Sequence, residues 1–122
     1  MTNFEKVQRM HEKYWPESIG IVPTFDMMQK RLGIIQEEVS ELKQAVNDKD
    51  AAGIVKELAD VLYSTYGMCV EMGFDIDEAF ARVHASNMSK DRPANSSEKL
   101  IKGPDYKPVD LADMVRNFRF RE

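Results

Sequence analysis

Apolar side chains recur every three or four residues along most of the chain, which is the spacing that places them on one face of an α-helix. A first short helix, ending near Pro16, is predicted by the series Phe4, Val7, Met10 and Tyr14. The next stretch, residues 17–23, contains Gly20 and Pro23 and is typical of a loop.

The middle of the chain predicts two long helices joined by a short polar turn. Thr24 is a suitable cap for a helix that runs through about Val46, and Asp50 is a suitable cap for one from Ala51 to about Met72. The residues expected to face inward on the first of these helices are Met28, Leu32, Ile35, Val39, Leu42 and Val46. Because the turn between them is so short, we expect the two helices to be antiparallel neighbours.

The last third of the chain predicts one further main helix and an irregular tail. Gly73 is placed to end the preceding helix, and Asp75 to start a fourth one with Glu78 as its capping-box partner. That helix should end before Pro93, and a final short helix is expected from about Leu111 to Phe120. The pattern therefore predicts an all-α fold: an antiparallel bundle of four main helices in a single domain, residues 1–122, with its core at about 24–90 and a tail at 91–122.

Composition narrows the function classes without naming one. The 122 residues carry 43% hydrophobic and 31% charged side chains, the balance of an ordinary globular domain. The formal net charge of -4 gives no reason to expect a nucleic-acid partner. With a single cysteine, Cys69, no disulfide can form within the chain, and no run approaches the ~20 apolar residues of a membrane span. A cytoplasmic protein without a membrane partner is expected.

Two pairs of acidic residues lie on helix faces that should be buried. At about 100° per residue, Glu38 falls among Ile35, Leu42 and other apolar residues, and Glu41 borders the same stripe. The next helix repeats this pattern with Glu57, and Asp60 lies about 60° away. Burying one unpaired carboxylate costs several kcal/mol, so four need a compensating charge.

A divalent cation would supply that charge. Glu-x-x-Glu and Glu-x-x-Asp each present two oxygen ligands one turn apart, and on antiparallel neighbours the two pairs can converge. Carboxylate-rich, all-oxygen coordination suits Mg²⁺, with Mn²⁺ as a possible substitute. The alternative is that the stripe edges are wet and that a lysine pairs with these acids: Lys30, Lys43 or Lys56.

Two other function classes remain open. A di-iron carboxylate bundle would want Glu-x-x-His on two helices, but Glu41 and Asp60 occupy the third positions here, and neither histidine follows a glutamate by three. A non-catalytic, metal-binding helical interaction module would keep the acidic bundle without turnover.

The acidic pattern resembles that of the all-α NTP pyrophosphohydrolase superfamily, the MazG-like proteins and their dUTPase, dCTPase and phosphoribosyl-ATP relatives. The motif is Glu37-Glu38-Val-Ser-Glu41 followed by Glu57-Leu-Ala-Asp60. Residues 86–90 are similar to the Asn-x-x-Lys of these families, and residues 102–108 to a Lys-Gly-rich tail found in a MazG-like subgroup.

The resemblance implies Mg²⁺-dependent cleavage of a nucleoside triphosphate between its α and β phosphates, giving a monophosphate and pyrophosphate. It implies four metal ligands, Glu38, Glu41, Glu57 and Asp60, with Glu37 orienting or deprotonating the attacking water. It also suggests that Asn87, Lys90 and the tail residue Lys102 bind the sugar and the phosphates. Trp15, at a helix end near the motif helix, is the aromatic residue expected to stack on the base. Members usually assemble, so a homodimer or homotetramer is expected, with the bundle completed between protomers.

Overall fold

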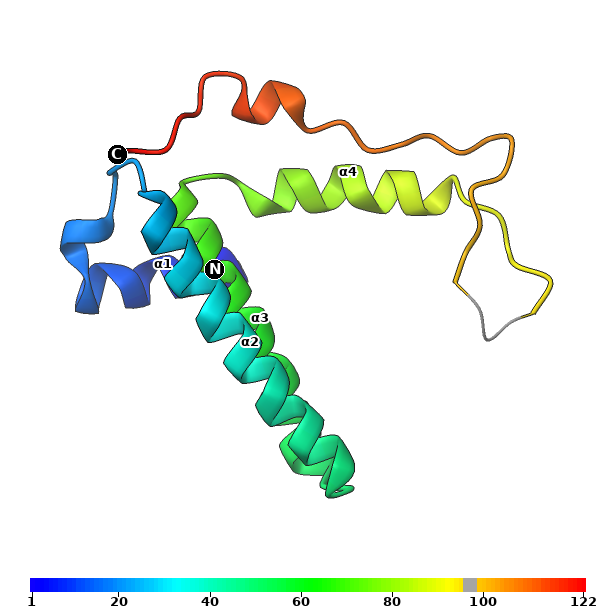
Figure 1. Ribbon diagram of the computed structural model, residues 1–122, viewed down its shortest axis with the longest axis horizontal. Coiled ribbons are helices and arrows are strands. Elements are labelled where there is room, and N and C mark those ends of the chain that lie inside the picture. Colours follow the sequence, from blue (N-terminus) through cyan, green and yellow to red (C-terminus); the bar gives the residue numbers. More distant parts are fainter. Residues whose placement is uncertain (96–98) are drawn as a thin grey trace. The chain divides into compact units, whose positions relative to one another are not determined.

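The computed structural model describes residues 1–95 and 99–122 and is helical throughout its regular parts (Figure 1). Its α-helices are α1 (Asn3–Tyr14), α2 (Phe25–Asn47), α3 (Ala51–Met72) and α4 (Ile76–Met88). Two short 3₁₀ turns, η1 (Pro16–Ser18) and η2 (Ala112–Val115), complete the elements. The described residues contain isolated β-bridges but no strand, so the predicted all-α class with four main helices is confirmed. None of the described helices has the length and apolar character needed to cross a membrane.

The described chain divides into two compact units. The first comprises residues 1–74 and 119–122, and the second comprises residues 75–118. The first unit is built on the hairpin of α2 and α3, which run side by side in opposite directions, as the short turn between them predicts (Figure 1). Helix α1 packs against α3, with Val7 and His11 as its buried residues.

The ends of α2 and α3 form where their capping residues predict. The hydroxyl of Thr24 accepts a hydrogen bond from the Met27 amide at 3.1 Å, and the carboxylate of Asp50 accepts one from the Gly53 amide at 3.0 Å. At the far end of α3, Gly73 has a φ of 77°, the left-handed conformation that a residue without Cβ adopts readily. These caps fix the start of both helices and therefore the register in which they face each other.

The side of the hairpin away from the acidic residues is more exposed than the periodicity predicts. On α2, Met28 and Ala45 are buried, but Leu32, Val39 and Val46 are 47–52% exposed in the single chain. These three residues recur every seven positions, about 100° around α2 from Glu38. Helix α3 covers the neighbouring face and leaves this stripe open.

The second unit corrects two expectations. The carboxylate of Asp75 accepts from the Asp77 amide at 2.9 Å and not from Glu78, so the predicted capping box is wrong. Glu78 instead accepts a hydrogen bond from Arg82, one turn later in α4. The helix expected from Leu111 to Phe120 is also wrong, because only the 3₁₀ turn η2 forms there. A short segment without a buried apolar face does not gain enough to nucleate an α-helix.

The tail lies along α4 and is attached by polar contacts. Arg82 reaches both carboxylate oxygens of Asp113 and the carbonyl of Asp110. The Lys107 amide donates to the hydroxyl of Ser89 at 2.8 Å. A single antiparallel bridge pairs Asp91 with Ile101. Within the tail, apart from the 3₁₀ turn η2, side-chain and backbone hydrogen bonds therefore take the place of regular secondary structure.

Glycine at position 67 allows α1 and α2 to approach α3. A Cβ at Gly67 would lie 3.3 Å from Nε2 of His11, which is tighter than most Cβ contacts, and 3.4 Å from Nη1 of Arg31, at the short end of ordinary van der Waals contact. A Cβ added at Gly33 in α2 would have no atom within 4 Å, so Gly33 serves as a matched control.

We expect Gly67→Ala to lower the free energy of unfolding and Gly33→Ala to raise it. Alanine stabilises an open helical position by about 0.5–1 kcal/mol, whereas crowding a packed site costs about 1–3 kcal/mol. Urea denaturation of both variants measures the difference. An equal gain in stability at both positions would contradict the packing of His11 and Arg31 over α3.

Candidate metal centre

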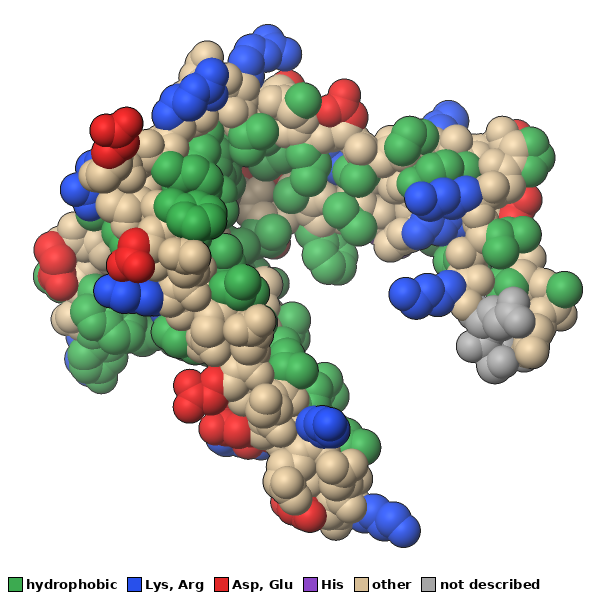
Figure 2. Space-filling model, viewed as in Figure 1, with side chains coloured by type: hydrophobic (Ala, Val, Ile, Leu, Met, Phe, Trp, Pro, Cys, Tyr) green, Lys and Arg blue, Asp and Glu red, His purple; other side chains and the backbone are tan. Residues whose placement is uncertain are grey.

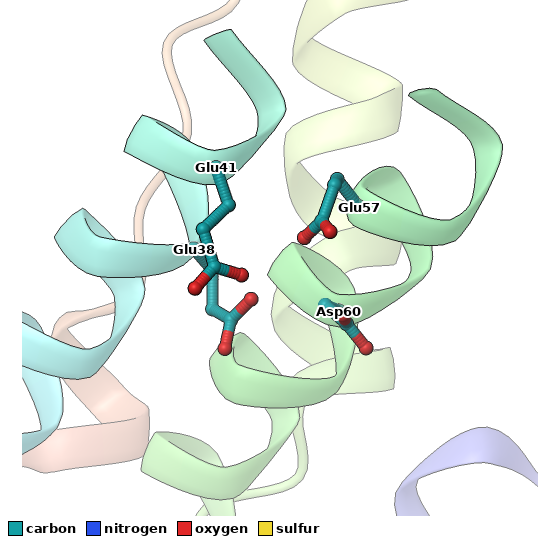
Figure 3. Close-up of side chains that lie close together, drawn as sticks. All are labelled: Glu38, Glu41, Glu57 and Asp60. Atoms are coloured by element: carbon teal, nitrogen blue, oxygen red, sulfur yellow. The ribbon is translucent and has the colours of Figure 1, made fainter. Parts of the chain in front are cut away.

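Four carboxylates converge between α2 and α3. Glu38 and Glu41 project from α2, and Glu57 and Asp60 project from α3 toward the same space (Figure 3). One oxygen from each of the four lies within 4.8 Å of the others. The separation of three residues in each pair is one helical turn, so each helix presents both of its acids on one face.

Two of these carboxylates are only partly satisfied by the protein. Oε2 of Glu38 and Oε2 of Glu57 are buried, and neither has a hydrogen-bond partner among the described residues. The pKa of Glu38 is raised above its ordinary value, first by burial and then by the negative charges of Glu41, Asp60 and Glu57. A cation between the two helices would satisfy both of these buried acceptors.

A lysine supplies part of that charge. Nζ of Lys56 lies 2.7 Å from Asp60 and 3.2 Å from Glu57, and the two carboxylates raise the pKa of the lysine. The alternative that a lysine pairs with these acids therefore holds in part: Lys56 contacts two of the four, whereas Lys30 pairs with Asp26. The ammonium side chain is 65% exposed, so the pair is screened by solvent and a stronger cation can displace it.

The donor set fits a hard divalent cation. It consists of carboxylate oxygens from two rigid helices, without the thiolate or imidazole ligands that zinc favours. The two buried acceptors lie on opposite sides of the seam, one on α2 and one on α3. The residues present therefore match Mg²⁺ or Mn²⁺ better than a softer metal.

Two other expected site residues lie in the same unit. Glu37 precedes Glu38 in α2 and is exposed, about 100° around the helix from it. Trp15 follows the end of α1 and is 42% exposed, with the guanidinium of Arg31 over its ring at 5.5 Å from the centroid. Both side chains are accessible to a ligand.

The remaining predicted residues lie in the second unit. Asn87 is exposed near the end of α4, and Lys90 follows the helix and is half-buried. Lys102 is exposed, and its ammonium lies over the ring of Tyr106 at 5.3 Å from the centroid. The four acidic ligands thus come together within one unit, and these three polar residues belong to the other.

Sequence reasoning missed a second polar cluster on the hairpin. Arg31 of α2 and Glu71 of α3 form an ion pair at 2.8 Å, with side chains 13% and 11% exposed. His11 is fully buried beside them, and neither of its ring nitrogens has a hydrogen-bond partner among the described residues. The available signal was spacing, because Arg31 precedes Glu38 by seven residues and so falls on the same helix face.

The chain is similar to known proteins in two comparisons. Over 47 residues, 38% of its length, it is 43% identical to the uncharacterized protein L479 of Acanthamoeba polyphaga mimivirus, of which it spans 19%. The family model of phosphoribosyl-ATP pyrophosphohydrolase matches residues 4–87, which include both acidic pairs. The chain therefore belongs to the phosphoribosyl-ATP pyrophosphohydrolase family, within the MazG-like superfamily of all-α NTP pyrophosphohydrolases.

Proposed function

We propose that this protein is a Mg²⁺-dependent nucleoside triphosphate pyrophosphohydrolase that cleaves between the α and β phosphates. The observation that carries the proposal is the convergence of Glu38, Glu41, Glu57 and Asp60, with two buried oxygens that lack donors. Membership of a family named for a pyrophosphohydrolase supports the reaction class, which is hydrolysis of a phosphoanhydride bond. That name also makes phosphoribosyl-ATP a second candidate substrate.

The reaction needs few protein groups beyond the ligands. Mg²⁺ held by the four carboxylates would neutralise phosphate charge and lower the pKa of a water molecule. Glu37, exposed next to Glu38, would accept the proton of the water that attacks the α–β anhydride. The water oxygen would bond to phosphorus as the P–O bond of the α–β anhydride breaks, and the products would be the nucleoside monophosphate and pyrophosphate. Asn87, Lys90 and Lys102 would bind the sugar and the outer phosphates.

We further propose that the protein works as a homodimer or homotetramer. The open stripe of α2 has a counterpart on α3, where Val55, Leu58 and Leu62 are 48–67% exposed. In Figure 2, hydrophobic side chains line one edge of the hairpin, and acidic ones gather on the other. A second copy would cover these residues. The single, half-buried cysteine is compatible with a reducing compartment, and we propose that the protein acts in the cytoplasm.

Glu38→Gln should abolish pyrophosphate release, because it removes a charged ligand and one of the two buried oxygens. We expect a loss on the order of 100-fold or more against a panel of nucleoside triphosphates and phosphoribosyl-ATP with Mg²⁺. The metal-free variant should melt no lower than the parent, since like-charge repulsion is relieved. Glu12→Gln, an exposed change in α1, is the matched control and should keep full activity. Full activity in Glu38→Gln would contradict the metal assignment.

Mg²⁺ should raise the melting temperature, because it binds only where the four acids are assembled. At about 100 times its Kd, a ligand specific for the folded state adds about 2.7 kcal/mol, which is several degrees for a small domain. Lys56→Gln should tighten Mg²⁺ binding severalfold in calorimetry by removing the competing ammonium, while Lys43→Gln should not. If neither Mg²⁺ nor Mn²⁺ moves the melting curve, the site is not a preformed metal centre.

Val39→Glu should reduce the oligomer to a monomer. A charge at the middle of the open α2 stripe would have to be desolvated on assembly. Val39→Leu, which keeps the position apolar, should leave the assembly intact. Sedimentation velocity distinguishes the two variants, and a monomeric parent protein would rule out the proposed interface.

A further inference from the structure

A pocket lies on the α2–α3 hairpin, farther along the helices than the four carboxylates. Its lining residues are Met27, Lys30, Arg31, Ile34 and Glu71, and we refer to it as the Arg31–Glu71 pocket. Met27 and Ile34 give it apolar walls. The ion pair of Arg31 and Glu71, at 2.8 Å and largely buried, supplies hydrogen-bond donors and acceptors.

The pocket opens on the same side of the hairpin as the carboxylates. Arg31 precedes Glu38 by seven residues, which is about 20° around α2 and about 10 Å along it. Glu71 follows Asp60 by eleven residues and is again about 20° away around α3. Ile34 lies a single turn before Glu38. The pocket is therefore in line with the metal ligands, at a distance comparable to that between the phosphates and the base of a nucleotide.

The polar pair is held in place from α1. The Trp15 ring packs against the Arg31 guanidinium, and the His11 ring meets Trp15 edge-on at 5.3 Å between centroids. Burial, with the positive charge of Arg31, lowers the pKa of His11, so its imidazole stays neutral beside the guanidinium. Gly67 leaves the room that His11 and Arg31 need. Arg31 is thus fixed by a packed cluster rather than by solvent-exposed contacts.

We propose that the Arg31–Glu71 pocket is the base-binding subsite of the nucleotide substrate, an inference that rests on the proposed function. Apolar walls with a few fixed polar groups are what recognition of a flat, hydrogen-bonding ligand requires. Arg31 can only donate hydrogen bonds and Glu71, when ionised, can only accept them. The pair therefore selects a base that presents an N–H group to Glu71 and an acceptor to Arg31.

Glu71→Gln tests this reading of the base edge. Because the glutamine amide both donates and accepts hydrogen bonds, the variant no longer requires the base to present an N–H group to position 71. Cytosine and uracil exchange donor and acceptor at adjacent positions, and we expect the ratio of kcat/KM for dCTP and dUTP to move toward unity by about tenfold. Glu17→Gln, an exposed change in the same unit, should leave the ratio unchanged. A uniform loss on both substrates, or no change in a folded Glu71→Gln variant, would overturn the proposal.

Binding without turnover provides an independent test. Trp15 is the only tryptophan of the chain and contacts Arg31, so its fluorescence reports on the pocket. Without metal, the preferred nucleoside monophosphate should give a saturable change, and ribose 5-phosphate should not. Arg31→Lys keeps the charge but loses the planar fork, and should weaken this binding about tenfold. An equal response to ribose 5-phosphate would refute a base subsite.

The two tests separate this inference from the proposed function. Base-dependent fluorescence in a protein that releases no pyrophosphate from any substrate would overturn the reaction and support the subsite. Pyrophosphate release whose selectivity ignores Glu71→Gln would support the reaction and overturn the subsite.

Discussion

Repulsion among four carboxylates is the constraint that the hairpin must satisfy. Their oxygens lie within 4.8 Å of one another, and two of them are buried without donors, so the folded chain holds negative charge where water cannot screen it fully. Lys56 offsets part of this charge from the exposed side. The two capped, antiparallel helices hold the four acids on facing sides, although Glu41 remains exposed to solvent. A divalent cation bound between the helices would relieve this repulsion.

The hairpin has a polar side, which carries the four acids, and an apolar side. On α2, residues seven positions apart fall on the same side, because seven residues make nearly two turns. Arg31, seven residues before Glu38 on α2, and Glu71, fourteen residues after Glu57 on α3, keep polar groups on the side that carries the four acids. Residues spaced by seven from Val39 are apolar, about 100° away, and remain open in the single chain. Charged side chains thus gather on one side of the hairpin, and exposed apolar side chains gather on the other.

Most of the fold and the acidic centre could be predicted, because both depend on local rules. Caps at Thr24 and Asp50 and the stop at Gly73 are set by nearby backbone groups, and acids three residues apart must share a helix face. Two predictions failed because side chains found other partners: Glu78 accepts a hydrogen bond from Arg82 instead of completing a capping box, and the segment after Leu111 is held to α4 by polar contacts and buries no residue in its 3₁₀ turn. The Arg31–Glu71 pair joins residues forty positions apart on two helices, and the periodicity of a single helix cannot predict such a pairing.

The attachment of the tail to α4 gives the chain two opposite responses to ionic strength. Arg82 connects Glu78, Asp110 and Asp113 through contacts that solvent reaches, and salt weakens such pairs. The first unit instead buries apolar side chains such as Val7, Met28 and Val70, and this burial is strengthened by sulfate or phosphate salts. Raising the concentration of a sulfate or phosphate salt would therefore loosen the segment after α4 while tightening the helices that hold the carboxylates. How firmly the tail is held against α4 therefore depends on the ionic strength of the solution as well as on the sequence.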